Sequence, residues 1–295
     1  MTVMLKKELR RLFGGLRGFA VIAILLLLCG LYTVLQNMLA GSVSFALSLG
    51  GAFPALVFAL PLLAAPTFSE EARAGAAPLL YSLGFRTRDI VIGKYLAQLT
   101  VFLLSMLVVA LYPLLLSFFG EIPMSESYFA WLGLLLLGAS LLALCNVISI
   151  FFRRAWINWT VGALAILSLY LLNVYLLKLP SAPWFSFVLL EVIAVGICLW
   201  IFFVLGSRLV AACAAVLPAA LALLFVFVPS LFQSLIPILL SRINPFSRFA
   251  GFIYGRMDLQ GILYFLSVIA LLLTVTVCIK AYRRDAECQN GKEGK

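Results

Sequence analysis

Long apolar runs alternate with short polar segments along the whole chain. An apolar run of roughly 18 or more residues can cross a hydrocarbon core about 30 Å thick as a helix. The pattern therefore predicts an all-α, polytopic helical membrane protein with about eight transmembrane helices. The predicted spans are Phe19–Gln36, Phe45–Ala65, Tyr95–Phe119, Tyr128–Phe152, Ile157–Leu177, Trp184–Leu205, Leu209–Val228 and Gly261–Ala281.

The region from 209 to 241 is the least regular part of this pattern, because Pro218, Pro229 and Pro237 interrupt it. Proline is tolerated in membrane helices but kinks them. We interpret the region as a kinked span followed by an outer interfacial helix, Pro229–Leu240. The alternative is a re-entrant pair before residue 230, which reduces the count to six spans and leaves both termini on the same side.

The composition supports the membrane assignment. Hydrophobic residues make up 65% of the chain, charged residues 11%, and the mean hydropathy is +1.17. A water-soluble domain of this composition would expose large apolar patches. No polar loop is long enough to fold alone. The sequence thus predicts a single transmembrane domain over residues 1–284, followed by a disordered cytoplasmic tail at 285–295.

The placement of charge predicts the orientation. The net charge is +10. If both termini are cytoplasmic, seventeen of the basic residues fall on the cytoplasmic side and four outside. This distribution agrees with the positive-inside rule. Because the basic residues stand at the ends of apolar runs, they favour membrane lipid as a partner and argue against nucleic acid.

Two amphipathic segments border the membrane spans. Residues 1–18 place leucines at helical spacing between lysines and arginines, which predicts an interfacial helix or a plain positive-inside anchor. Residues 242–261 alternate aromatic and basic side chains, which predicts a second interfacial helix at the outer leaflet. We expect its rings, among them Phe246, Phe249 and Phe252, at headgroup depth.

A charged segment, Thr67–Lys94, separates the second and third predicted spans. Thr67 and Glu70 form a capping-box pattern, and Ser69 is a second candidate cap. The segment therefore predicts a short cytoplasmic helix that begins near Ser69 and runs to about residue 76, with Glu70 and Glu71 in its first turn. The alternative is an ordinary solvated loop.

Within the predicted spans, Glu191 is the one charged residue far from a span end. Ionisable residues inside a membrane are costly and often functional. Glu191 is therefore a candidate for a substrate path, or it faces a wet cavity or the outer surface.

Other chemistry is missing from the sequence. The chain has no histidine, and its six cysteines form no CxxC pair, which argues against a metal site or a disulfide framework. Gly93-Lys94 lacks the upstream glycine of a phosphate-binding loop and is followed by Tyr95. We therefore expect no cofactor, no ATP site of its own and no enzyme activity.

The charged segment contains the run Phe68-Ser69-Glu70-Glu71-Ala72-Arg73-Ala74-Gly75, then a leucine-rich stretch, then Gly93-Lys94. In this order of residues it resembles permeases of the type-2 ABC transporters, in the branch that includes the gliding-motility and nitrous-oxide-reductase-maturation permeases. The opening KKELRRLF resembles the interfacial helix of that family, and Asn244–Arg284 resembles its closing segment. The chain departs from the family at Pro78, at Arg153-Arg154 and in an extra apolar region, 181–240.

The resemblance implies a permease subunit of an ATP-driven exporter in the bacterial cytoplasmic (inner) membrane. Its implied partners are a separate cytoplasmic ABC ATPase subunit, which binds the ATP, and a second copy or a homologous permease in a dimer. A secondary transporter or a non-transporting scaffold is the alternative. The residues expected to couple to the ATPase are Ser69, Glu70, Glu71, Arg73, Gly75, Arg88 and Lys94.

Overall fold

The computed structural model describes residues 2–41, 44–74, 87–176, 183–184, 187–188, 191, 225, 235–256 and 258–293. Every element of secondary structure in these ranges is a helix. The helices are α1 (Thr2–Phe13), α2 (Leu16–Thr33), the π-helix η1 (Val34–Leu39), α3 (Phe45–Gly51), α4 (Phe53–Ala64), α5 (Pro66–Ala74), α7 (Thr87–Val109), α8 (Tyr112–Leu116), α9 (Met124–Phe151), α10 (Ala155–Leu176), α13 (Leu235–Ile243), α14 (Pro245–Ile253) and α15 (Leu259–Glu293).

Six helical stretches in the described part of the chain are long and apolar enough to cross a membrane. They are Leu16–Leu39, Phe53–Glu70, Thr87–Leu116, Met124–Phe151, Ala155–Tyr175 and Leu259–Arg284. The all-helical class is thus confirmed, and these long apolar helices are compatible with a multi-pass membrane protein. The predicted spans Trp184–Leu205 and Leu209–Val228 lie almost entirely outside the described residues, as does the first half of Pro229–Leu240, so a count of eight stays a prediction.

The chain divides into two compact units. Unit 1 comprises Met1–Tyr170 and Pro245–Lys295, and unit 2 comprises Leu171–Asn244. The sequence predicts one domain over both. The tail predicted to be disordered instead continues α15 as far as Glu293. Extending an existing helix fixes one residue for each added hydrogen bond, and 285–293 contains no proline to stop it.

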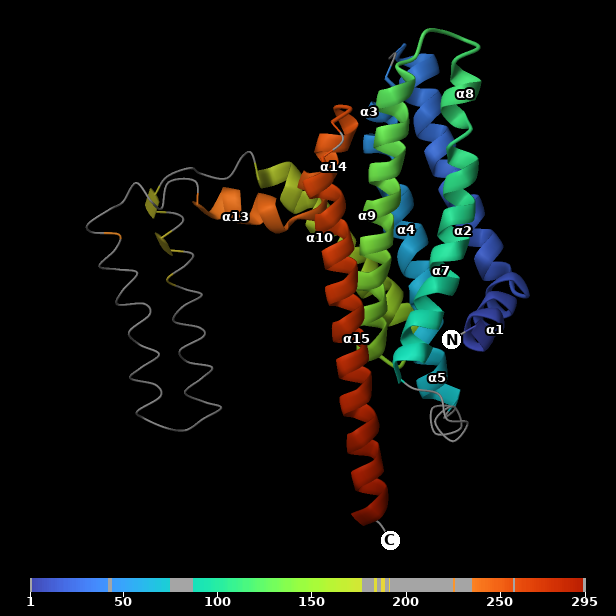
Figure 1. Ribbon diagram of the computed structural model, residues 1–295, viewed down its shortest axis with the longest axis vertical. Helices are drawn as coiled ribbons and strands as arrows, with labels where there is room; N and C mark the ends of the chain where they lie inside the picture. Colours follow the sequence, from blue (N-terminus) through green and yellow to red (C-terminus); the bar gives the residue numbers. More distant parts are fainter. Residues whose placement is uncertain are drawn as a thin grey trace. The chain divides into compact units, whose positions relative to one another are not determined.

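In unit 1, α9 lies between α7, α4, α14 and α15 and contacts all four (Figure 1). Small residues on α9 allow these close approaches. A Cβ added at Gly138 would overlap the ring of Phe102 on α7, and one at Gly133 would lie 2.6 Å from Cβ of Phe252 on α14. Small residues where helices cross are typical of helix packing in membranes, where no hydrophobic force drives apolar helices together.

The aromatic face of α14 is part of this core. Phe246, Phe249 and Phe252 are 5%, 5% and 0% exposed. The helix predicted in this region is present, but other helices cover these rings instead of lipid, and their place at headgroup depth stays a prediction. An amphipathic pattern identifies an apolar face and does not say whether lipid or another helix covers it. Here α9 and α3 cover it.

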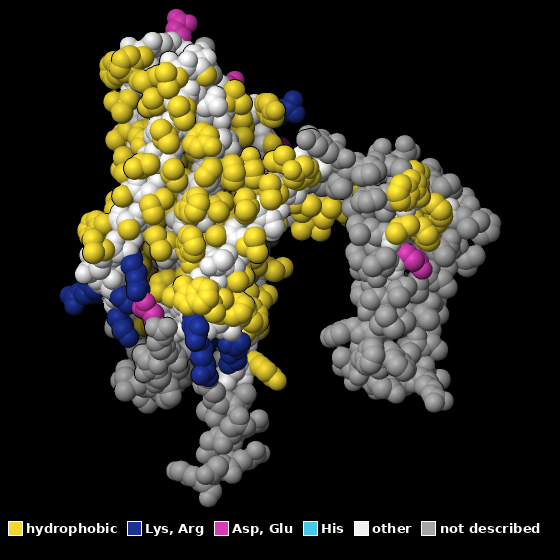
Figure 2. All heavy atoms as spheres, turned by 180° about the vertical axis from the view of Figure 1, so that it is seen from behind, with side chains coloured by type: hydrophobic (Ala, Val, Ile, Leu, Met, Phe, Trp, Pro, Cys, Tyr) yellow, Lys and Arg dark blue, Asp and Glu magenta, His cyan; other side chains and the backbone are white. Residues whose placement is uncertain are grey.

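The outer surface of unit 1 is apolar. Leu27, Leu107 and Leu164 on three different helices are 65%, 60% and 63% exposed. Figure 2 shows a wide apolar belt on this unit, with Lys and Arg side chains gathered at the end that holds α1. The far end of α15 lies at the same end of the unit (Figure 1). This arrangement agrees with the charge asymmetry in the sequence.

Candidate functional site: the junction of α1, α5 and α7

The charged end of unit 1 is organised around the start of α5. This helix begins at Pro66, and only Ala65 separates it from α4. The predicted start near Ser69 is therefore wrong. Proline suits the first position of a helix because the missing N–H needs no partner. Ser69 is buried in the helix and donates its Oγ proton to the Ala65 carbonyl (2.8 Å) instead of capping the helix.

The early start of α5 also moves Glu70 out of the first turn, and the side chain pairs with arginines. Glu70 Oε2 lies 3.3 Å from Arg11 Nη2 on α1, and Glu70 Oε1 accepts a hydrogen bond from Arg17 Nη1 on α2. Arg11 also lies 3.4 Å from Glu8 Oε2. Each pair is partly exposed and worth little alone. Together they fix α5 to the elbow formed by α1 and α2.

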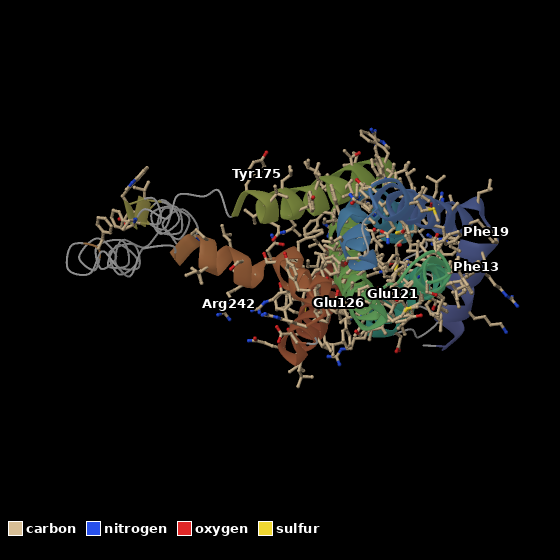
Figure 3. All side chains as sticks on the ribbon, turned by 90° about the horizontal axis from the view of Figure 1, so that it is seen from above. Phe13, Phe19, Glu121, Glu126, Tyr175 and Arg242 are labelled. Atoms are coloured by element: carbon tan, nitrogen blue, oxygen red, sulfur yellow. The ribbon has the colours of Figure 1, made fainter. Side chains whose placement is uncertain are left out.

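The elbow itself is held by a ring contact. The rings of Phe13 and Phe19 lie edge to face with centroids 5.9 Å apart (Figure 3), across the Gly14–Gly15 turn that joins the two helices. Edge-to-face pairs are favourable beyond the area that they bury. The contact keeps α1 folded back against α2 and α7, which it also touches.

Lys94 is the most deeply buried charge of the junction. Its side chain is 1% exposed, its Nζ donates to the Thr67 carbonyl (2.5 Å), and Nζ lies 3.9 Å from Glu8 Oε1 and 4.8 Å from the centroid of Phe68. A Cβ at Gly93 would lie 3.2 Å from Met4 Cβ, so the glycine lets α1 approach α7 closely enough for this pairing.

The position of Lys94 corrects two expectations. The third span begins at Thr87 and not at Tyr95, so Lys94 lies nearly two turns inside α7. It is also not available at the surface for a partner protein. A paired, hydrogen-bonded lysine costs far less to bury than an isolated one. Lys94 therefore holds α1 and α5 in position from inside the helix bundle.

A chain of polar side chains continues from Thr67 into the bundle. Gln98 Nε2 on α7 donates to Thr67 Oγ1 (2.5 Å) and to Asn146 Oδ1 on α9 (3.2 Å), and Asn146 Nδ2 donates back to Gln98 Oε1 (2.6 Å). All three residues are buried. A satisfied buried network rigidifies the elements that it joins, so α5, α7 and α9 are held in one arrangement.

The α4–α5 joint is held on its other side by Asn158 of α10. Its Nδ2 lies within hydrogen-bond distance of the carbonyls of Ala65 (3.3 Å), Ser149 (3.2 Å) and Phe152 (3.0 Å). One amide therefore ties the joint to the end of α9. Asn158 was not among the residues predicted to belong to the site.

The remaining predicted site residues fall in different places. Arg88 is exposed on the first turn of α7. Glu71 and Arg73 belong to α5, but their side chains and Gly75 lie outside the described residues. Glu191 belongs to unit 2, and its Oε2 is buried without a hydrogen-bond partner.

Sequence reasoning missed several members of the junction: Glu8, Arg11, Arg17, Gln98, Asn146 and Asn158. Two signals were present. Glu8 is the one acidic residue before Glu70, and it stands among basic residues. Gln98 and Asn146 are single amides in long apolar runs, where an unpaired polar group would be costly.

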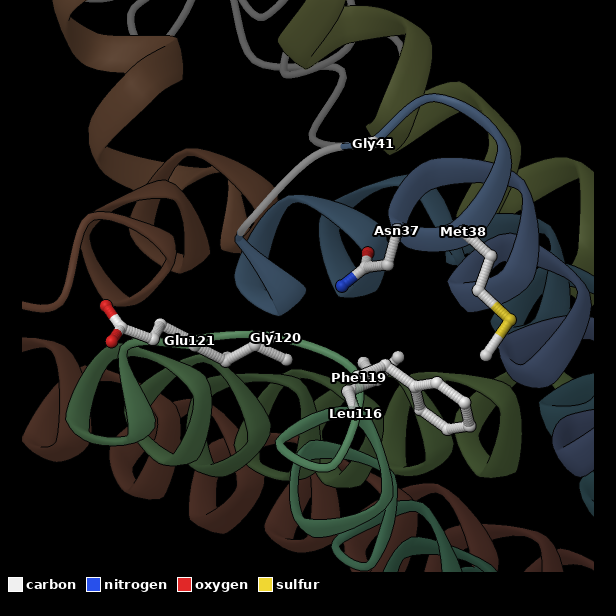
Figure 4. Close-up of a pocket in the computed structure, with 8 residues that line it drawn as sticks. Asn37, Met38, Gly41, Leu116, Phe119, Gly120 and Glu121 are labelled. Carbon is white, nitrogen blue, oxygen red and sulfur yellow. The ribbon is translucent and has the colours of Figure 1, made fainter.

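A cavity of about 430 Å³ lies at the opposite end of unit 1 (Figure 4). The π-helix η1 supplies Asn37, whose Oδ1 accepts from Ser48 and whose Nδ2 is buried without a partner. Glu121 lines the cavity, but its carboxylate points away from it (Figure 4). Among the residues that the structure describes, no group of His, Cys, Asp and Glu could hold a metal ion.

Neither the family models nor the curated proteins with which we compared the sequence matched it.

Proposed function

We propose that this chain is the membrane-spanning permease subunit of an ATP-driven ABC transporter, an exporter that works with a separate cytoplasmic ATPase. The resemblance of Phe68–Gly75 to the coupling segment of type-2 permeases supports the proposal. A dimer with a second copy or a homologous permease belongs to the same proposal. So does a place in the bacterial inner membrane, with both termini in the cytoplasm.

The observation that carries the proposal is the fixation of α5 on three sides. Glu70 is paired with Arg11 and Arg17 of the elbow, Thr67 is bonded by Lys94 and Gln98 of α7, and α4 continues into α5 almost without a break. A force applied to α5 would therefore move α2, α4 and α7 together. A surface loop with no mechanical role needs none of these contacts.

Arg88 is exposed on the first turn of α7, and we assign it to the docking surface. We assign Glu71, Arg73 and Gly75 to the same surface on the resemblance of Phe68–Gly75 to the coupling segment of type-2 permeases. Ser69 and Lys94 are 1% exposed, so we assign them to holding α5 in place. In this proposal, the partner binds and hydrolyses the ATP, and this chain supplies the path through the membrane.

The test is affinity purification of the tagged chain from its native membrane in mild detergent. We expect a stoichiometric soluble subunit with Walker motifs, and we expect Glu71→Lys and Gly75→Pro to remove it without reducing membrane insertion. Glu121→Lys, an exposed position in the α8–α9 link, is the matched control. Retention of the subunit by both variants would contradict the assignment of the docking surface.

A secondary transporter is the second candidate, and Glu191 is the observation in its favour, because buried carboxylates in membranes commonly carry coupled protons or ions. Under that alternative, Glu191→Gln abolishes transport and no ATPase co-purifies. A co-purifying ATPase together with an active Glu191→Gln variant would exclude it.

A further inference from the structure

A cavity of about 280 Å³ opens beside the α4–α5 joint, between that joint, the start of α2 and the start of α10. Its lining combines one cation with apolar and aromatic side chains. The residues that line it include Arg17, Leu62, Pro66, Trp156 and Trp159. The lining is polar at one edge and apolar over the rest, as expected for a ligand with a charged head and an apolar body.

The polar edge is positively charged. The Arg17 side chain is 53% exposed and gives one of its terminal nitrogens to Glu70. A guanidinium has five N–H donors, so it can hold a second anion. Arg153 and Arg154 are exposed directly before α10, and the first N–H groups of a helix favour an anion at its start. These features fit a phosphate group.

The apolar part of the cavity is lined by two tryptophans, Trp156 and Trp159. Trp156 is 63% exposed, and the indole Nε1 of Trp159 donates to the Phe58 carbonyl (3.3 Å), which holds its ring along α4. Tryptophan is enriched where headgroups meet acyl chains. Leu164, two turns further along α10, is also exposed, so an acyl chain leaving the cavity would meet an apolar surface.

The ion-pair network can release Arg17 at small cost. Glu70 is paired with Arg11 as well as with Arg17. If Arg17 turns to another anion, the Glu70 carboxylate keeps a cationic partner and is not left uncompensated. An anion in the cavity therefore competes with Glu70 for Arg17.

We propose that this cavity binds an anionic glycerophospholipid of the adjacent leaflet, with its phosphate at Arg17 in competition with Glu70 and its chains along Trp156 and α10. Lipid composition would thereby set how firmly α5 is tied to α2. The binding itself does not depend on an ATPase partner, so it can be tested on the purified chain.

The experiment uses a variant with Trp131, Trp184 and Trp200 replaced by Phe, so that Trp156 and Trp159 report the cavity. The chain is reconstituted in vesicles of brominated phosphatidylcholine, and phosphatidylglycerol is titrated in to displace the quencher. We expect phosphatidylglycerol to be preferred over phosphatidylcholine by about fivefold, which corresponds to roughly 1 kcal/mol for one arginine near an anionic surface.

Three substitutions separate a built site from general surface charge. Arg17→Gln should remove the preference, Glu70→Gln should increase it by freeing Arg17, and Arg10→Gln should leave it unchanged, because Arg10 is an exposed cation of α1 that does not line the cavity. No preference in the parent chain would overturn the proposal. So would an equal loss in Arg10→Gln and Arg17→Gln, or a preference that Glu70→Gln leaves unchanged or lowers.

Discussion

Replacing Glu8 by Gln tests the buried charge pair on which the junction depends. The Lys94 and Glu8 side chains are 1% and 5% exposed, with Nζ and Oε1 3.9 Å apart. Two unit charges at this distance attract by about 4 kcal/mol at an effective dielectric constant of 20. Lys94 keeps its bond to the Thr67 carbonyl in the variant. We therefore expect a loss of about 3 kcal/mol, at the lower end of the range for breaking one side of a buried pair.

Replacing the lysine of this pair should lower the free energy of unfolding by a smaller amount. Lys94→Met leaves Glu8 next to Arg11, whose Nη1 lies 3.4 Å from Glu8 Oε2, and we expect a loss of about 2 kcal/mol. The double variant should lose less than the sum of the two, by a coupling free energy of about 1–3 kcal/mol. The double variant no longer contains the buried lysine that Glu8→Gln leaves uncompensated.

The free energy of unfolding can be measured by reversible SDS titration of the chain in mixed micelles, followed by tryptophan fluorescence. Glu121→Gln is the control, because Glu121 is exposed at the other end of unit 1, and its effect should stay within about 0.5 kcal/mol. A loss below about 0.5 kcal/mol for Glu8→Gln, or strict additivity in the double variant, would refute the pairing.

Two further predictions concern packing and the α4–α5 joint. Gly138→Ala should cost about 1–3 kcal/mol in the same titration, because the added methyl overlaps the ring of Phe102. Gly251→Ala, where a Cβ meets nothing within 4 Å, should be neutral or stabilising, and an equal loss in both would contradict the packing. Asn158→Ala should cost about 1–3 kcal/mol, because the carbonyls of Ala65, Ser149 and Phe152 lose the amide donor that they share, although that of Ala65 keeps the Ser69 hydroxyl. Asn158→Asp should cost more, since a carboxylate would face those carbonyls; the reverse order would contradict the bonding.

The sequence pattern predicted the helices better than their contacts. Apolar runs located the six described spans, because a run of hydrophobic residues as long as the membrane is thick is rare outside transmembrane helices. The start of α7 was missed because a lysine near the end of an apolar run is usually a flanking charge. The residues around Lys94 in the sequence do not distinguish it from such a flanking lysine, because its partner Glu8 lies on another helix.

The candidate site was found only in part. The charged segment and Glu70 were recognised, but the capping pattern at Thr67 was misread, since Pro66 begins the helix and Thr67 instead accepts from Gln98. The partners of Glu70, Arg11 and Arg17, lie more than 50 positions away in the chain. Such pairs depend on how α1 folds back on the bundle, which a single sequence does not specify.

Site-specific photo-crosslinking in intact cells is the sharpest test of coupling to an ATPase. A benzophenone amino acid at Arg88, the exposed residue of α7 that we assign to the docking surface, should crosslink to a soluble protein with Walker motifs. The same probe at Glu121, at the opposite end of unit 1, should not. We expect an ATPase to be crosslinked from Arg88 alone. No ATPase at Arg88, or equal crosslinking from both positions, would contradict the proposed coupling role.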